Sequence, residues 1–135
     1  MLDNCYLYNI KTDNTIIAIN ANDVTIDNVI VEGKGLTVNS GMVEFAGNIA
    51  IIDSTVKGRI KSANDNTTFG GFISTVQYLK ATPGNVYLSN CVVDDLTVTQ
   101  SFKDEDNKYN IGGLFGRDII NVNVIVVEPK IYLNI

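Results

Sequence analysis

The phrase Leu2-Asp3-Asn4-Cys5 returns along the chain as Ile26-Asp27-Asn28-Val29, Ile52-Asp53-Ser54-Thr55 and Leu88-Ser89-Asn90-Cys91. Each copy reads as an apolar residue, then Asp or Ser, then Asn or Ser, then a small or β-branched residue. A weaker fifth copy follows at Ile119-Ile120-Asn121-Val122. The four clear copies lie about 24 to 36 residues apart, a spacing that is typical of proteins built from stacked repeats.

Strand-sized runs rich in Val, Ile and Thr lie between these phrases, and no apolar stripe of helical period interrupts them. A sandwich of hairpins would give similar strand spacing, but it would give no reason for one turn phrase to recur. Stacked coils give one, because they lie about 4.8 Å apart and allow equivalent Asn side chains to hydrogen-bond along the stack. We therefore expect a structural turn ladder of Asn4, Asn28, Ser54 and Asn90.

The sequence predicts an all-β fold, a right-handed parallel β-helix (β-solenoid) of about four to five coils. The longer intervals predict loops that leave the solenoid near residues 77–85, which include Pro83-Gly84, and near residues 101–110. Residues 1–135 have the length of a single domain. Neither end carries a polar cap, so we expect an excerpt of a longer repeat protein. The alternative is a subunit that stacks end to end into a filament.

Charge and hydropathy exclude two classes of partner. The formal net charge of -5 and the pI near 4.5 argue against nucleic acid, because a phosphate backbone requires a basic surface. The longest apolar runs, such as Val124-Ile125-Val126-Val127, are far too short to cross a bilayer, so no direct membrane insertion is expected.

Glycine-rich motifs mark the second half of the chain. They are Gly112-Gly113-Leu114-Phe115-Gly116 and Gly70-Gly71-Phe72-Ile73-Ser74, with Ser89-Asn90-Cys91 between them. Residues 69–117 thereby resemble the GLUG repeat of bacterial surface and secreted proteins, with Ser74 in place of the last glycine. The resemblance implies a β-solenoid segment of an adhesin-like protein, located at the cell surface or outside the cell, with no catalytic residues to transfer. The motif glycines Gly70, Gly71, Gly112, Gly113 and Gly116 allow tight corners and close approach of backbones.

The chain has no histidine, which removes histidine-based nucleophile pairs, acid–base catalysis and most zinc sites. An enzyme would depend on carboxylates. Asp27 and Asp53 hold the same phrase position and could lie about 5 Å apart, as in a retaining glycosidase, with Asp3 extending the row. The blander interpretation is three exposed turn acids that bind their own backbone. We favour it, because no Arg or aromatic subsite accompanies the acids.

The acidic run of Asp104, Glu105 and Asp106 could hold calcium, since it concentrates oxygen ligands in one loop. It lacks the alternate spacing of an EF-hand loop, and a solvated charge run is the alternative. We expect no other cofactor.

Cys5 and Cys91 fill the same position of the phrase, three copies apart. That placement separates them by about 14 Å along the stack, whereas a disulfide requires Cα atoms within about 7 Å. We expect two inward-facing free thiols. Tyr6 and Tyr8 alternate with Cys5 and Leu7, so one of these pairs faces outward.

These observations favour a non-catalytic structural or adhesive module, a stalk or spacer of a surface or secreted protein. Its expected partners are neighbouring coils of the same chain or other copies end to end, together with glycans or surface proteins. Two alternatives stay open: a β-helix that binds or cleaves polysaccharides through a row of carboxylates, and a self-assembling filament subunit.

Overall fold

The structure is a computed structural model that describes residues 2–13, 17–38, 41–62, 68–77, 84–100, 110–112, 114–120 and 122–134. These ranges contain β-strands and no helix. The strands are β1 (Leu2–Asp13), β2 (Ala18–Val38), β3 (Val43–Ile52), β4 (Thr55–Ser62), β5 (Thr68–Gly70), β6 (Ile73–Gln77), β7 (Gly84–Ser89), β8 (Val92–Gln100), β9 (Asn110–Gly112), β10 (Phe115–Ile120), β11 (Val122–Val127) and β12 (Lys130–Asn134).

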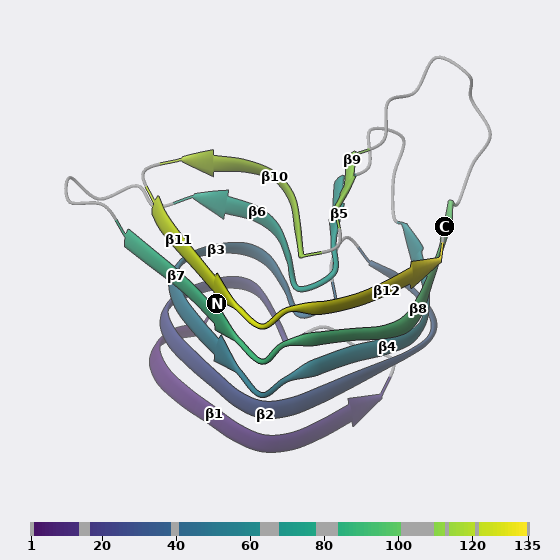
Figure 1. The fold of residues 1–135 in the computed structure, drawn as a ribbon, viewed down its shortest axis with the longest axis horizontal. Coiled ribbons are helices and arrows are strands. Elements are labelled where there is room, and N and C mark those ends of the chain that lie inside the picture. Colours follow the sequence, from purple (N-terminus) through teal and green to yellow (C-terminus); the bar gives the residue numbers. More distant parts are fainter. Residues whose placement is uncertain are drawn as a thin grey trace.

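Every pairing between these strands is parallel. Ten strands form one sheet whose main path runs β10-β6-β3-β2-β4-β8-β12, with β1 beside β2 and with β7 between β3 and β11. The strands β5 and β9 form a second, small sheet. Figure 1 shows the large sheet curling, so that β1, β2, β4, β8 and β12 lie one above another. The protein is thus all-β, with a curled, open parallel sheet, and the all-β and parallel predictions are confirmed.

Both loops that the sequence predicts fall largely outside the described residues. The structure resumes at Gly84, where β7 begins, and at Asn110, where β9 begins. Residues 78–83 and 101–109, which make up most of the two predicted loops, lie outside the described ranges.

The chain bends sharply where β3 leads into β4 and where β7 leads into β8, and a single left-handed residue makes each bend. Residue 28 shows the geometry: Asn28 has φ of 51°, and extended strand precedes and follows it within β2. Asn and Asp tolerate this conformation better than other non-glycine residues, because their short polar side chains bind locally. The corner repeats in each successive strand layer, at Asn9, Asn28, Asp53, Asn90 and Glu128, all with φ between 49° and 54°.

A second corner of the same kind precedes the first by a few residues. Its left-handed members are Asn4, Asp23 and Asn48. Between the two corners each strand runs straight, with side chains alternating inward and outward, as in Val24–Asp27 beside Ile49–Ile52. The two corners therefore delimit one flat segment of the sheet.

The register of the recurring phrase differs from the one that the sequence predicts. Asn28 and Asn90 do share a corner, but the residue between them is Asp53, and Asn9 rather than Asn4 begins the series. Asn4 lies at the second corner, and Ser54 lies one position beyond the first. The reason for the shift at Ser54 is conformational: a left-handed corner prefers Asp to Ser, so Ile52-Asp53-Ser54-Thr55 is offset by one residue from the copies at Ile26–Val29 and Leu88–Cys91.

Glycines build a third bend, which includes part of the GLUG-like motif. The backbone N–H of Gly41 donates to the carbonyl of Gly70 (3.1 Å), and that of Met42 donates to the carbonyl of Phe72 (3.2 Å). The N–H of Phe72 in turn donates to the carbonyl of Leu114 (3.0 Å). Gly41-Met42 therefore occupies the position of Gly71-Phe72 in the neighbouring layer. The sequence analysis did not identify this further glycine turn. Gly112 pairs with Gly70 and Gly116 lies in β10, whereas Gly113 falls outside the described residues.

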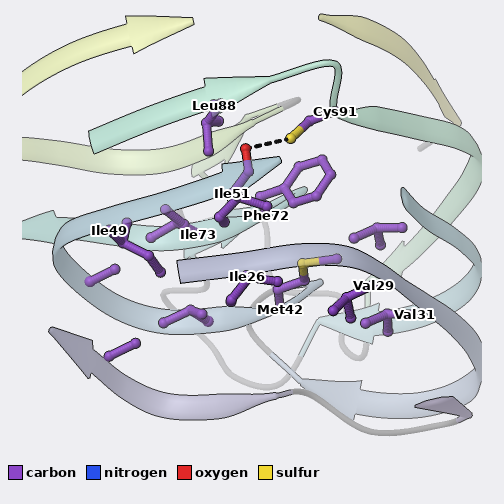
Figure 2. Close-up of a cluster of buried hydrophobic side chains, with 14 of the residues drawn as sticks. Ile26, Val29, Val31, Met42, Ile49, Ile51, Phe72, Ile73, Leu88 and Cys91 are labelled. Atoms are coloured by element: carbon purple, nitrogen blue, oxygen red, sulfur yellow. Dashed lines mark hydrogen bonds between the residues drawn. The ribbon is translucent and has the colours of Figure 1, made fainter. Parts of the chain in front are cut away.

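The concave side of the curled sheet holds the core, in which side chains stack in columns, one residue from each strand layer. Figure 2 shows Ile26, Ile51 and Leu88 in one column, all fully buried. Each buried side chain of this size stabilises the fold by about 1.5 to 3 kcal/mol relative to exposure. The other large buried side chains are Phe72, Met42, Ile73, Leu96, Val29, Val31, Val43 and Val56.

Candidate functional site

The flat segment between the two corners presents one outward face that differs from the rest of the described surface. Parallel register aligns its outward residues in two columns. The inward residues that alternate with them are buried or partly buried in the core. We call this surface the tyrosine face. Its columns are Tyr6, Thr25, Ala50, Tyr87 and Ile125, and Tyr8, Asp27, Ile52, Ser89 and Val127.

Aromatic and aliphatic side chains dominate the tyrosine face. Tyr6, Tyr8 and Ile125 are each more than half exposed, at 53%, 59% and 57%. Tyr87 and Val127 are also exposed. Exposed aromatic and aliphatic side chains that gather on one face mark interaction sites more often than scattered ones do.

Asp27 is the one charged residue of the tyrosine face, and a tyrosine binds it. The Tyr6 hydroxyl donates a 2.6 Å hydrogen bond to Oδ2 of Asp27. This hydrogen bond to the carboxylate raises the pKa of the Tyr6 hydroxyl, with smaller contributions from desolvation and from the charge of Asp27. The rings of Tyr6 and Tyr8 lie 5.2 Å apart between centroids, tilted by 38°. The contacts fix both rings at one edge of the face.

A shallow depression of about 320 Å³ lies where the tyrosine face meets the second corner. Its lining includes Asp23, Thr25, Asn48, Ala50, Asn85 and Tyr87. Ala50 makes the hollow, because its small side chain stands beside the larger Tyr87 in the same column. The polar side is ordered within the chain: the Asn48 amide donates to Oδ1 of Asp23, and Asn48 Oδ1 accepts the backbone N–H of Asn85 (3.1 Å).

The three aspartates that the sequence singles out lie in three different columns. Asp3 pairs with Asn22, Asp27 lies between Tyr8 and Ile52, and Asp53 stands at the first corner. The register therefore does not stack Asp27 upon Asp53. Asp53 instead accepts a 3.0 Å hydrogen bond from the Asn90 amide, a structural contact within the corner.

The first corner carries polar side-chain contacts on both sides of the sheet. Outside, the Asn28 amide donates to Oδ1 of Asn9 (2.8 Å). Inside, the fully buried Ser54 hydroxyl accepts the backbone N–H of Val29 (3.1 Å) and donates to the carbonyl of Ile52 (2.9 Å). These two bonds satisfy the buried hydroxyl of Ser54, so Ser54 has a structural role.

Both cysteines are free thiols, as the sequence predicts. Cys91 is 1% exposed and follows the first corner, while Cys5 is partly buried against the core in the flat segment. They thus lie in different columns rather than in the shared one that the phrase indicated. The Cys91 thiol donates to the carbonyl of Ile51 (3.2 Å), as Figure 2 shows, and burial raises the pKa of this thiol to about 11.

The acidic run of Asp104, Glu105 and Asp106 lies outside the described residues. Among the residues that are described, no group of three or more His, Cys, Asp or Glu side chains is placed to hold a metal ion. The described chain also contains no helix of the length and hydropathy that crossing a membrane requires.

The sequence did not single out Tyr87, Asn85 or the depression between them. A usable signal exists in β7, where exposed Asn85 and Tyr87 alternate with buried Val86 and Leu88. The hollow itself depends on which residue the neighbouring strand places beside Tyr87, and only the register supplies that.

Comparisons with protein-family models, with curated proteins and with solved structures found no match to this chain. The GLUG resemblance of residues 69–117 therefore stays a prediction from the motifs.

Proposed function

We propose that the chain is a stretch of right-handed parallel β-helix that acts as a non-catalytic structural or adhesive module, a stalk or spacer of a surface or secreted protein. The repetition of one corner in successive layers supports this proposal most directly. Side chains that bond across layers are 19 residues apart at Asn9 and Asn28, and 37 apart at Asp53 and Asn90. Equivalent corners that recur at intervals of different length are expected of a solenoid.

The register of the described residues places Asp3, Asp27 and Asp53 in three different columns, which disfavours the alternative of a carboxylate row. Asp27 binds a tyrosine hydroxyl and Asp53 binds an amide, so each has a structural contact. The GLUG resemblance supports the surface or secreted location.

Two measurements test this function. Purified chain is incubated with a panel of neutral and acidic polysaccharides, and released ends are quantified; we expect no turnover. Turnover that disappears in the Asp27→Ala/Asp53→Ala double variant would replace the structural module with an enzyme. Antibodies raised against the chain, applied to intact cells of the source, test the location, and a purely cytoplasmic signal contradicts it.

End-to-end association is a second candidate, which the direction of the corner bonds favours. Each Asn amide donates to the layer before it, as Asn28 does to Asn9 and Asn90 does to Asp53. The first described layer thus ends in the donor group of Asn9, and the last ends in Glu128, whose carboxylate accepts.

Sedimentation velocity over a wide concentration range tests this association. We expect concentration-dependent oligomers that the Asn9→Asp variant weakens, because a carboxylate at residue 9 still accepts from Asn28 but repels Glu128. A monomer at every concentration rules out the second candidate and leaves the first intact.

A further inference from the structure

The tyrosine face is uncharged apart from Asp27, whereas the outward face beyond the first corner is not. The next outward positions form two columns, of which the first is Lys11, Ile30, Thr55, Val92 and Lys130. In the second column Glu32 pairs with Lys57 and Lys57 pairs with Asp94, so charges of opposite sign alternate there from strand to strand. A solvated solenoid surface normally looks like that second face. The tyrosine face departs from it, which indicates a ligand without charge.

The depression on the tyrosine face has one apolar side and one polar side. Tyr87 is 37% exposed and lies in register with Ala50, whose small side chain leaves space beside it. Thr25, Asn85 and the Asn48–Asp23 pair supply the polar part of the lining. An aromatic wall with a few convergent hydrogen-bonding groups is the usual lining of a small-molecule site, and about 320 Å³ falls within the common range of about 300 to 1,000 Å³.

A sugar ring matches these two sides. A pyranose presents C–H groups on its flat faces, which pack on an aromatic ring, and hydroxyls around its rim, which bind amides and carboxylates. The rim of the depression also carries the Asp23 carboxylate, which accepts a hydrogen bond from the Asn48 amide. That same carboxylate, together with the net charge of -5, disfavours a glycan that carries carboxylates of its own.

The geometry of the columns extends the site beyond one ring. Tyr6, Thr25, Ala50 and Tyr87 follow one another in register, so Tyr6 and Tyr87 stand about 14 Å apart at the usual strand spacing. Successive sugars of an extended glycan are spaced comparably to successive strands. A short oligosaccharide laid along this column therefore reaches from one tyrosine to the other.

We propose that the tyrosine face binds a neutral polysaccharide chain, with Tyr87 stacking on a sugar seated over Ala50, and with Asn85 and Thr25 binding its hydroxyls. This goes beyond the structural role proposed above and requires no turnover. It also uses a different set of residues from the row Asp3, Asp27 and Asp53.

Calorimetric titration of the full chain with cello-, xylo- and manno-oligosaccharides tests the proposal, with oligogalacturonate as the charged counterpart. We expect saturable binding of at least one neutral series and much weaker binding of oligogalacturonate. Tyr87→Ala removes the stacking surface and lowers the affinity about tenfold. Ala50→Leu fills the depression with an outward side chain and abolishes binding.

The matched control is Tyr132→Ala, because Tyr132 is 61% exposed but belongs to β12, outside the tyrosine face. It should bind as tightly as the parent chain, and circular dichroism should show all variants folded. The proposal is overturned if no neutral series binds, if oligogalacturonate binds as tightly, or if folded Tyr87→Ala and Ala50→Leu variants retain full affinity. Binding without turnover leaves the structural role standing, whereas turnover alone contradicts only that role.

Discussion

The Asn90 amide donates a 3.0 Å hydrogen bond to Oδ1 of Asp53, and both residues are left-handed, with φ of 51° and 49°. Asn28 donates to Asn9 in the same sense, at 2.8 Å. A residue at the corner thus meets two requirements: it adopts a backbone conformation that most side chains disfavour, and its amide hydrogen-bonds to the previous layer. Asn meets both, and the two contributions can be separated by mutation.

Asn90→Ala loses both contributions. The left-handed conformation costs alanine about 1 kcal/mol, and the lost side-chain bond costs about 1 kcal/mol more. We expect urea unfolding to show a free energy of unfolding lower by about 2 kcal/mol. Asn90→Gly is the control, since glycine adopts the conformation freely and loses the bond. Equal losses for the alanine and glycine variants would show that the conformation contributes nothing.

Glu128 is the poorest fit among the corner residues. It has φ of 52° with a longer side chain that gains little from local hydrogen bonds in this conformation. We expect Glu128→Asn to raise the free energy of unfolding by about 0.5 to 1 kcal/mol. The new amide would also lie beside Asn90, the preceding residue of the corner. Glu128→Gln removes the charge but keeps the length, so it should leave stability nearly unchanged; a gain as large as that of Glu128→Asn would assign the effect to charge.

The sequence predicts the all-β class, the parallel pairing and the free thiols, because these depend on composition and on a repeating turn phrase. It predicts the ladder only in part. Asn28 and Asn90 share a corner, but the intervening residue is Asp53 rather than Ser54, since a left-handed position selects Asp over Ser. Aligning the copies on conformational preference rather than on order would have placed Asp53 correctly.

The tyrosine face was harder to foresee, for a geometric reason. Alternation predicts that Tyr87 points outward, but the hollow beside it exists only because β3 places Ala50 in register with it. The two residues belong to layers whose corner partners are 37 positions apart, with residues 78–83 between them. Because the interval between corner partners varies from 19 to 37 residues, the sequence does not reveal the register, and a site that spans layers becomes visible only in the structure.

The buried thiol of Cys91 predicts a pH dependence of stability. Burial raises its pKa from 9.0 to about 11, so the folded state holds the proton over a range in which the unfolded thiol loses it. The resulting stabilisation is fully present below pH 9 and is lost as the pH rises toward about 11. We expect it to amount to about 2 kcal/mol.

Comparison with Cys91→Ala isolates this contribution, because tyrosines and lysines titrate in the same range in both proteins. The difference in the free energy of unfolding between parent and variant should shrink between pH 9 and about 11. A difference that stays constant across that range would mean that Cys91 ionises equally in the folded and unfolded states.

Gly41 offers the sharpest test of the third bend. A Cβ at residue 41 would collide with the carbonyl oxygen of Gly71 and would stand 2.7 Å from Cγ1 of the fully buried Val56. Backbone and core must both move to relieve these contacts, so we expect Gly41→Ala to lower the free energy of unfolding by about 3 kcal/mol.

Met42→Leu is the matched control: it follows Gly41 in the same bend, and leucine already holds the equivalent position at Leu114. It should cost less than about 1.5 kcal/mol. If Gly41→Ala proves as mild as Met42→Leu in thermal and urea unfolding, the close stacking of Gly41 on Gly71 is wrong, and with it the placement of Gly41-Met42 at the position of Gly71-Phe72 in the neighbouring layer.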